Sequence, residues 1–265
     1  MQEIWNLILY NYVGILVVFA RVMGIFIFNP IMGRSTVPMR VRVAMTLVLT
    51  MAMLAHLSGG SDLIGYVPTS IPGFVGVLIL EALVGFIFGF IVNMILNVII
   101  LAGKIIDNQI TIALAEVMDP TTGVTMPIMA NLYYYLFVLY FFLVGGHLSY
   151  ISLFARSYRI VPIGFSLSLE WIGMAGDIVD FLGVVFTLAL KMAMPIIAAE
   201  MILQICVGVI MKAVPSIQIF VINIQMKILM GLFIIMAIAG PMSDFIERLM
   251  GIMFENLYGT LERMG

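Results

Sequence analysis

The sequence is poor in the residues on which soluble proteins and metal sites depend. Only 10% of its 265 residues are charged and 63% are hydrophobic, whereas a soluble domain usually has about 25% charged residues. Its one cysteine, Cys206, excludes an internal disulfide. The two histidines, His56 and His147, are not spaced from that cysteine as zinc ligands are. A net charge of −2 gives no basis for nucleic-acid binding. We therefore expect an integral membrane protein without a metal, a cofactor or a nucleic-acid partner.

Sequence motifs of enzymes are missing as well. The chain contains no His-Glu-x-x-His zinc motif, no phosphate-binding loop and no Gly-x-Ser-x-Gly nucleophile motif. His147 and Ser149 are two positions apart, so they would lie on different faces of a helix. The sequence thus predicts no catalytic residues and no enzymatic activity.

Apolar segments dominate what is present. A helix needs about 20 mostly apolar residues to cross the hydrocarbon core of a bilayer, and residues 82–103 and 120–155 contain no Asp, Glu, Lys or Arg. We predict an all-α membrane protein with about six hydrophobic helical segments. They cover residues 4–32, 41–57, 71–103, 127–154, 181–213 and 216–241.

A different pattern follows Gly240-Pro241, which we expect to end the last long segment. Apolar residues recur there at helical spacing, with charged residues between them, which predicts an amphipathic helix at 242–265. Such a helix suits the membrane interface or a partner surface. Its apolar positions are Ile246, Leu249, Met250, Met253, Leu257, Leu261 and Met264.

Four charged residues fall inside the apolar segments: Arg21, Glu81, Lys191 and Glu200. An ionisable group within a membrane segment normally faces protein or water. Lys191 and Glu200 are nine positions apart, which places them on opposite faces of one helix. Each therefore needs a partner from another element. The charges are interpreted either as buried ion pairs that fix helix register or as parts of a wet interior or a subunit interface.

The third apolar segment carries two further patterns. Asn93, Asn97, Lys104, Asn108 and Thr111 stay within about 60° of one another around a helix. This polar stripe could line a conduit or form hydrogen bonds to neighbouring helices. Gly85 and Gly89 form a small-residue motif that permits close helix packing.

Three stretches of the chain match a known family in order and spacing. The first stretch is Phe28-Asn29-Pro30-Ile31-Met32-Gly33 with Pro38-Met39-Arg40-Val41-Arg42. The second contains Leu101-Ala102-Gly103, Gln109, Ala113, Ala115, Asp119-Pro120, Gly146-His147-Leu148 and Pro162-Ile163-Gly164. The third contains Pro195, Val207-Gly208, Pro215, Ile219-Phe220-Val221-Ile222 and Lys227. Across about residues 15–240 the chain resembles the FliR family, the flagellar biosynthetic proteins of the type III export gate. Residues 223–226 depart from the family pattern.

The resemblance implies a fold, partners and a location. Residues 1–175 would form a half similar to FliP, and residues 176–241 a helical hairpin similar to FliQ, turning near residues 213–215 and kinked at Pro195. One copy would complete a helical ring with FliP and FliQ subunits, next to FlhB and FlhA, in the inner membrane at the flagellar basal body. The ring would form and seal the conduit for unfolded flagellar export substrates.

The resemblance also implies a plug for the closed pore at about residues 112–125. Such a segment can be built from polar groups that bind water, two helix-interrupting residues and a flexible methionine. An ordinary surface turn has a similar composition. The plug positions are Glu116, Met118, Asp119, Pro120, Thr121, Thr122 and Gly123.

Two other functions remain open at this point. The virulence-type homologue of FliR shares much of the pattern, so an export-gate subunit of a virulence secretion system is the nearest alternative. A small-solute secondary transporter is the other. It would have related halves with broken helices at the midplane, and no clear repeat is visible between the halves.

Overall fold

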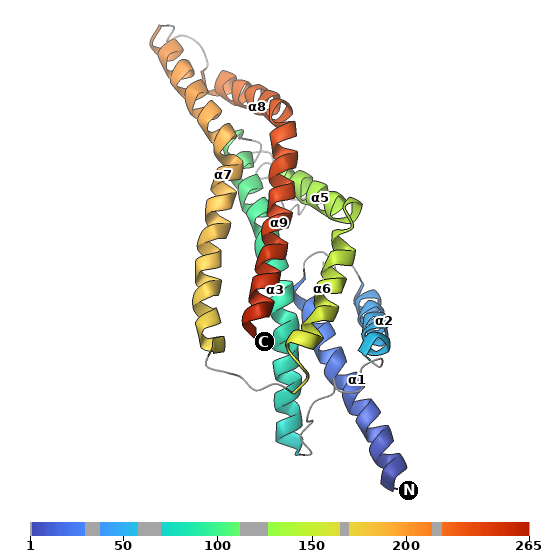
Figure 1. Cartoon of the computed structure of the whole chain (residues 1–265). Coiled ribbons are helices and arrows are strands. Elements are labelled where there is room, and N and C mark those ends of the chain that lie inside the picture. The colour runs from blue at the N-terminus through green and yellow to red at the C-terminus, as the bar shows by residue number, and fades with distance from the viewer. Residues whose placement is uncertain are drawn as a thin grey trace. The chain divides into compact units, whose positions relative to one another are not determined.

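The computed structural model describes residues 2–29, 38–57, 70–111, 127–164, 170–213 and 219–264. Within these ranges every regular element is a helix (Figure 1). The helices are α1 (Gln2–Phe28), α2 (Met39–Leu57), α3 (Ile71–Gln109), α5 (Ile128–Leu143), α6 (Gly146–Ile160), α7 (Glu170–Ala213), α8 (Ile219–Ala237) and α9 (Ala239–Met264). The all-α class predicted from the sequence is confirmed.

Several helices are long and apolar enough to cross a bilayer. By length and composition, Met39–Leu57, Ile71–Gln109 and Ile178–Ile210 qualify alone, and two broken helix pairs raise the number to as many as five. The pairs are α5 with α6 and α8 with α9. Val13–Phe28 of α1 is a shorter apolar helix. The chain is therefore a membrane-embedded protein, although its six hydrophobic segments are not six uniform spans.

A glycine separates α5 from α6. Gly145 has φ 75°, the left-handed conformation that glycine adopts without steric strain. The segment predicted as one helix at 127–154 is consequently two helices. No charged residue marks this break, because residues 120–155 contain no Asp, Glu, Lys or Arg, and the available local signal is the Gly145-Gly146 pair.

Chain direction changes again after α8. The axes of α8 and α9 differ by 65° at a break around Ile238, and Gly240 and Pro241 lie in the first turn of α9. The sequence analysis expects this pair to end a helix, whereas in the structure it begins one. A proline is tolerated in the first turn because the amide it lacks would have no intrahelical acceptor there.

Helix α7 exceeds the thickness of a membrane. Its 44 residues include Pro195, and the helix continues through that position. At 1.5 Å per residue it is about 66 Å long, against about 30 Å for a hydrocarbon core. Part of α7 must therefore lie outside the hydrocarbon layer unless the helix is steeply tilted.

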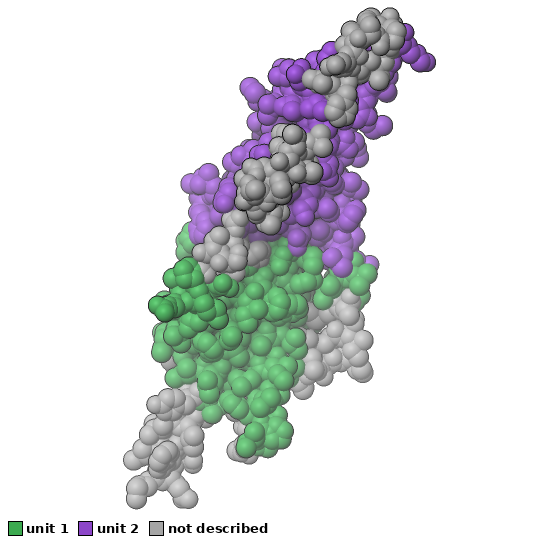
Figure 2. Space-filling model, turned by 180° about the vertical axis from the view of Figure 1, so that it is seen from behind, with its two compact units in different colours: residues 1–94, 144–179, 252–265 green, residues 95–143, 180–251 purple. Residues whose placement is uncertain are grey.

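The chain divides into two compact units (Figure 2). Unit 1 contains residues 1–94, 144–179 and 252–265, and unit 2 contains residues 95–143 and 180–251. These units follow packing and not chain order, because α3, α7 and α9 contribute to both. The division at 175 and 241 rests on the family resemblance and stays a prediction.

Each unit has its own core. In unit 1, Phe88 lies edge-on to Phe154, which lies edge-on to Tyr158, at ring-centroid distances of 5.6 and 5.5 Å. In unit 2, Ile106 and Ala189 are completely buried. Lipid tails are as apolar as these side chains, so close van der Waals packing stabilises such cores more than removal from water does.

The amphipathic helix predicted at 242–265 is present as α9. All seven of its predicted apolar positions are buried. The interpretation that this face lies on a membrane surface or a partner needs correction, because the face is covered within the chain's own fold. Spacing predicts which face is apolar but does not identify what covers it.

Candidate functional site

The Arg21 cluster of unit 1 consists of Arg21, Glu81, Ser157, Tyr158 and Val161. Arg21 Nε donates to Glu81 Oε2 at 2.5 Å, and both side chains are fully buried. Its Nη1 donates to Ser157 Oγ at 3.3 Å, and its Nη2 donates to the Val161 carbonyl at 3.0 Å. The guanidinium thus joins α1, α3 and α6 and uses its fork of donors in three directions.

An aromatic ring completes the Arg21 cluster. The guanidinium carbon of Arg21 lies 4.3 Å from the ring centroid of Tyr158, within the range of a cation–π interaction. The Tyr158 hydroxyl donates to the Val18 carbonyl at 3.4 Å. The structure therefore assigns two of the four predicted intramembrane charges to a structural ion pair.

Gly85 and Gly89 lie where α3 crosses α1. A Cβ atom added to Gly85 would collide with the Arg21 carbonyl oxygen, and one at Gly89 would lie 3.0 Å from the Ile25 oxygen. Gly24 of α1 is equally tight, because its Cβ would lie 2.5 Å from the Ala82 carbonyl oxygen. This small-residue motif therefore packs against α1 within unit 1.

The predicted polar stripe lies along the outer side of α3. Asn97, Lys104 and Asn108 are exposed, and Asn93 and Thr111 are half-buried. Asn93 Nδ2 donates to the Phe28 carbonyl at 3.4 Å in unit 1. Thr111 has φ 60° and ends the helix. Whether the exposed part of the stripe faces a conduit or another chain stays a prediction.

Asp107 is a buried polar residue of unit 2 that the sequence analysis does not select. It is 1% exposed, and the backbone amide of Met129 donates to its Oδ2 at 3.0 Å and its Oδ1 at 3.3 Å. The carboxylate thus caps the first turn of α5, where the helix dipole favours a negative charge. The available signal was an acidic residue within an apolar helix, next to the polar stripe.

A glycine strengthens the same junction. A Cβ atom on Gly103 would overlap the backbone of Ala130, so α3 and α5 approach very closely there. Gly103 and Asp107 are one turn apart on α3. Together they hold the two helices that flank residues 112–126.

Glu200 and Lys191 have different surroundings on α7. Lys191 is exposed, whereas Glu200 is fully buried. Neither carboxylate oxygen of Glu200 has a hydrogen-bond partner among the described residues. Lys227 of α8, itself 8% exposed, is the cation that acts on this carboxylate through space. Unit 2 therefore buries a charge that its own groups satisfy incompletely.

A residue of α8 and a residue just after the end of α3 pack beside Glu200 of α7. Gly231 of α8 lies so close to Ile110 that a Cβ atom would overlap that side chain, and the same atom would lie 3.7 Å from Glu200 Oε1. This junction is tightly packed around the carboxylate.

The predicted plug positions, residues 116 and 118–123, lie outside the described residues. In the part of the chain that the structure does describe, no group of three or more His, Cys, Asp or Glu side chains could hold a metal ion. The described sites are thus ion pairs, helix caps and close helix contacts.

Comparison with known proteins adds the decisive observation. The model of the family described as "Bacterial export proteins, family 1" matches residues 12–253. The chain belongs to this family. The resemblance to FliR predicted from the sequence motifs is thereby confirmed.

Individual members of the export family resemble the chain over most of its length. Flagellar biosynthetic protein FliR of Escherichia coli K12 is 26% identical over 248 residues, covering 92% of this chain and 91% of that protein. FliR of Bacillus subtilis 168 is 23% identical over 266 residues, covering 98% and 99%. Surface presentation of antigens protein SpaR of Shigella sonnei is 24% identical over 219 residues, covering 82% of each.

Proposed function

We propose that this export-family protein is a subunit of a flagellar type III protein-export gate. The observation that carries the proposal is the family match over residues 12–253, together with FliR relatives that align over more than nine tenths of both chains. In this function the chain forms and seals a conduit for unfolded export substrates, in the bacterial inner membrane, and catalyses no reaction.

The described helices support a role inside a larger assembly. Within the 18-residue apolar window of the span Ile178–Ile210 only 22% of the residues are buried in the chain itself, and α7 is about twice as long as a hydrocarbon core is thick. Subunits similar to FliP and FliQ would cover such a surface where lipid does not. They could also provide groups that satisfy the Glu200 carboxylate. FlhB and FlhA are further expected neighbours.

Residues 112–125 are proposed as the plug of this gate. The described contacts support an anchored position for them, because Asp107 and Gly103 of α3 hold Met129 and Ala130 of α5. A polar segment that connects two fixed helix ends could close a pore without carrying the structural load of the assembly.

Deletion of residues 114–124 tests the plug. Assembly should persist, because the anchoring contacts lie outside the deleted segment, and membranes containing the complex should become leaky to small ions. The measurement is ion conductance across a planar bilayer at matched complex concentration. Unchanged conductance in assembled complexes would remove the plug from the proposal.

Removal of the gene from its own bacterium tests the system. A flagellar gate predicts loss of swimming and of filament subunits from the medium, both restored by the intact gene. The match to SpaR keeps a virulence secretion system as the second candidate. That system predicts normal swimming and lost secretion of needle components. Normal swimming together with normal secretion would contradict both.

A further inference from the structure

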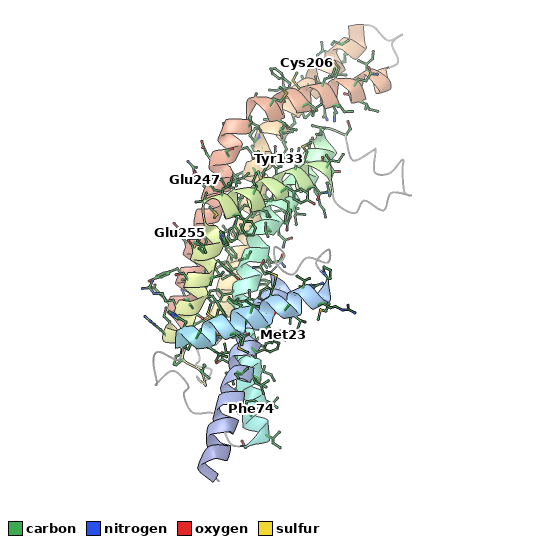
Figure 3. The ribbon with its side chains drawn as sticks, turned by 90° about the vertical axis from the view of Figure 1, so that its right-hand side faces the viewer. Met23, Phe74, Tyr133, Cys206, Glu247 and Glu255 are labelled. Carbon is green, nitrogen blue, oxygen red and sulfur yellow. The ribbon has the colours of Figure 1, made fainter. Side chains whose placement is uncertain are left out.

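A groove in unit 1 runs along the side of α2 that faces α1 and α6. It encloses about 510 Å³ between α1, α2 and α6. Figure 3 shows α2 lying across α1 at a steep angle. Apolar side chains form most of its wall, including Ile25, Phe26, Val48, Leu49, Ile151 and Phe154. We call this the α2 groove.

The length of the α2 groove matches one leaflet of a bilayer. Its lining residues on α2 extend from Arg40 to Ala52, which corresponds to about 18 Å along a helix. Half of a hydrocarbon core is about 15 Å. The volume also lies within the usual range for small-molecule sites. A single extended acyl chain therefore fits the groove in both length and bulk.

Charge is confined to one end of the α2 groove. Among the described residues, Arg40 is its one charged lining group, and it lies in the first turn of α2. Helix α2 contains no acidic residue, and its first-turn amides add a positive partial charge. Arg42 raises the local positive charge further, although it does not line the groove. An apolar groove with a positively charged end is complementary to an acyl chain that carries an anionic head group.

We propose that the α2 groove binds one acyl chain of an anionic glycerophospholipid, whose phosphate pairs with Arg40. The lipid then covers the exposed side chains of Met45 and Val48, which lie at 43% and 71% exposure in the chain alone. This proposal depends on the protein being embedded in a membrane. It does not depend on which secretion system the chain serves.

Native mass spectrometry of the purified full-length chain tests the proposal. The chain is titrated with phosphatidylglycerol and with phosphatidylcholine that carry identical acyl chains. We expect one tightly held phosphatidylglycerol, bound at least fivefold more tightly than phosphatidylcholine. Equal affinity for the two lipids would overturn the assignment of the phosphate to Arg40.

Two matched pairs of variants locate the site. Arg40→Gln should abolish the preference for phosphatidylglycerol, whereas Arg42→Gln, two positions away and outside the groove, should keep it. Ala44→Phe fills the groove and should weaken binding of both lipids at least tenfold. Val43→Phe places the same aromatic side chain on an exposed neighbour that does not line the groove. Equal effects within either pair would show general surface binding and overturn the proposal.

A second measurement covers the outcome in which Ala44→Phe fails to fold. Ala52→Phe obstructs the opposite end of the groove and should reproduce the lost affinity in a chain that elutes as one species. In the assembled complex, a photo-crosslinking residue at position 48 should yield a lipid adduct. A crosslink to a neighbouring protein subunit in its place would show that protein, and not lipid, occupies the groove.

Discussion

In unit 1 the buried Arg21 and Glu81 side chains meet at 2.5 Å, and Arg21 also donates to the Ser157 hydroxyl and the Val161 carbonyl. In unit 2 the buried Glu200 carboxylate lacks a hydrogen-bond partner among the described residues, and Lys227 acts on it only through space. Burying a charge is tolerable when it is paired and hydrogen-bonded, and costly otherwise. Unit 1 therefore bonds its buried carboxylate directly to a cation, whereas the buried carboxylate of unit 2 has no such bond among the described residues.

Breaking the Arg21–Glu81 ion pair should have the largest effect on folding. Arg21→Met leaves Glu81 as an unpaired buried charge, which costs about 3–5 kcal/mol, a large share of the roughly 5–15 kcal/mol that stabilises a typical protein. We expect little folded chain in membranes, measured as the monodisperse fraction in mild detergent. Arg159→Met, at an exposed position on α6, is the control. The double variant Arg21→Met/Glu81→Met should recover much of the loss, and failure to do so would show that the pair itself is not the cause.

The helix crossing next to this pair should be the second most sensitive place. Gly85→Leu forces a side chain into the Arg21 carbonyl and should cost about 1–3 kcal/mol or more. Gly76→Leu is the matched control, because a Cβ atom at Gly76 meets nothing within 4 Å on the same helix. The measurement is the melting temperature of the isolated chain. If Gly85→Leu melts normally but fails to bind partner subunits, the motif serves assembly and not the internal packing.

Removing the cap of α5 should have a smaller and more local effect. Asp107→Ala deprives the Met129 amide of its acceptor and should cost about 0.5–2 kcal/mol. Hydrogen exchange should accelerate in the first turn of α5 and remain unchanged in α6. Asn108→Ala, at an exposed neighbouring position, should leave the exchange of α5 unchanged. Equal acceleration in both variants would argue against a specific cap.

Neutralising the unsatisfied charge should have the smallest effect and the opposite sign. Glu200→Gln removes a buried charge and should stabilise the isolated chain by on the order of 1 kcal/mol. In a purified complex the same change should be neutral or destabilising, because a partner is expected to meet the carboxylate there. Thermal denaturation of both preparations gives the comparison. A loss of stability in the isolated chain would show that Lys227 already satisfies the carboxylate.

The sequence alone predicts the helical class, the apolar segments and the buried face of α9, because each depends on composition or on the period of a helix. It does not predict the break at Gly145, since the charge-free run of residues 120–155 continues on both sides of that residue. Nor does it identify the partner of Arg21. Residues 21 and 81 are brought together by a tertiary crossing that leaves no local pattern, and only the small residues at positions 24, 85 and 89 suggest a close approach.

The residues of the candidate site also divide into those that the sequence predicts and those that only the structure reveals. Intramembrane charges stand out from the sequence because they are rare in apolar segments, and the structure adds which of them are paired. Asp107 does not stand out in this way, because it lies beyond the apolar segment at 71–103 and next to a residue of the polar stripe. The family is recognised from the order and spacing of many short motifs. The helical fold alone does not carry that information.

The single cysteine provides a site for labelling α7 and measuring what surrounds it. Cys206 is exposed on α7 near the end of the long helix (Figure 3), and the sequence contains no second thiol. A spin label or fluorophore can therefore be attached there without first engineering a cysteine-free background. Its spectrum would report directly whether this end of α7 is surrounded by water, by acyl chains or by a neighbouring subunit, in the isolated chain and again after assembly.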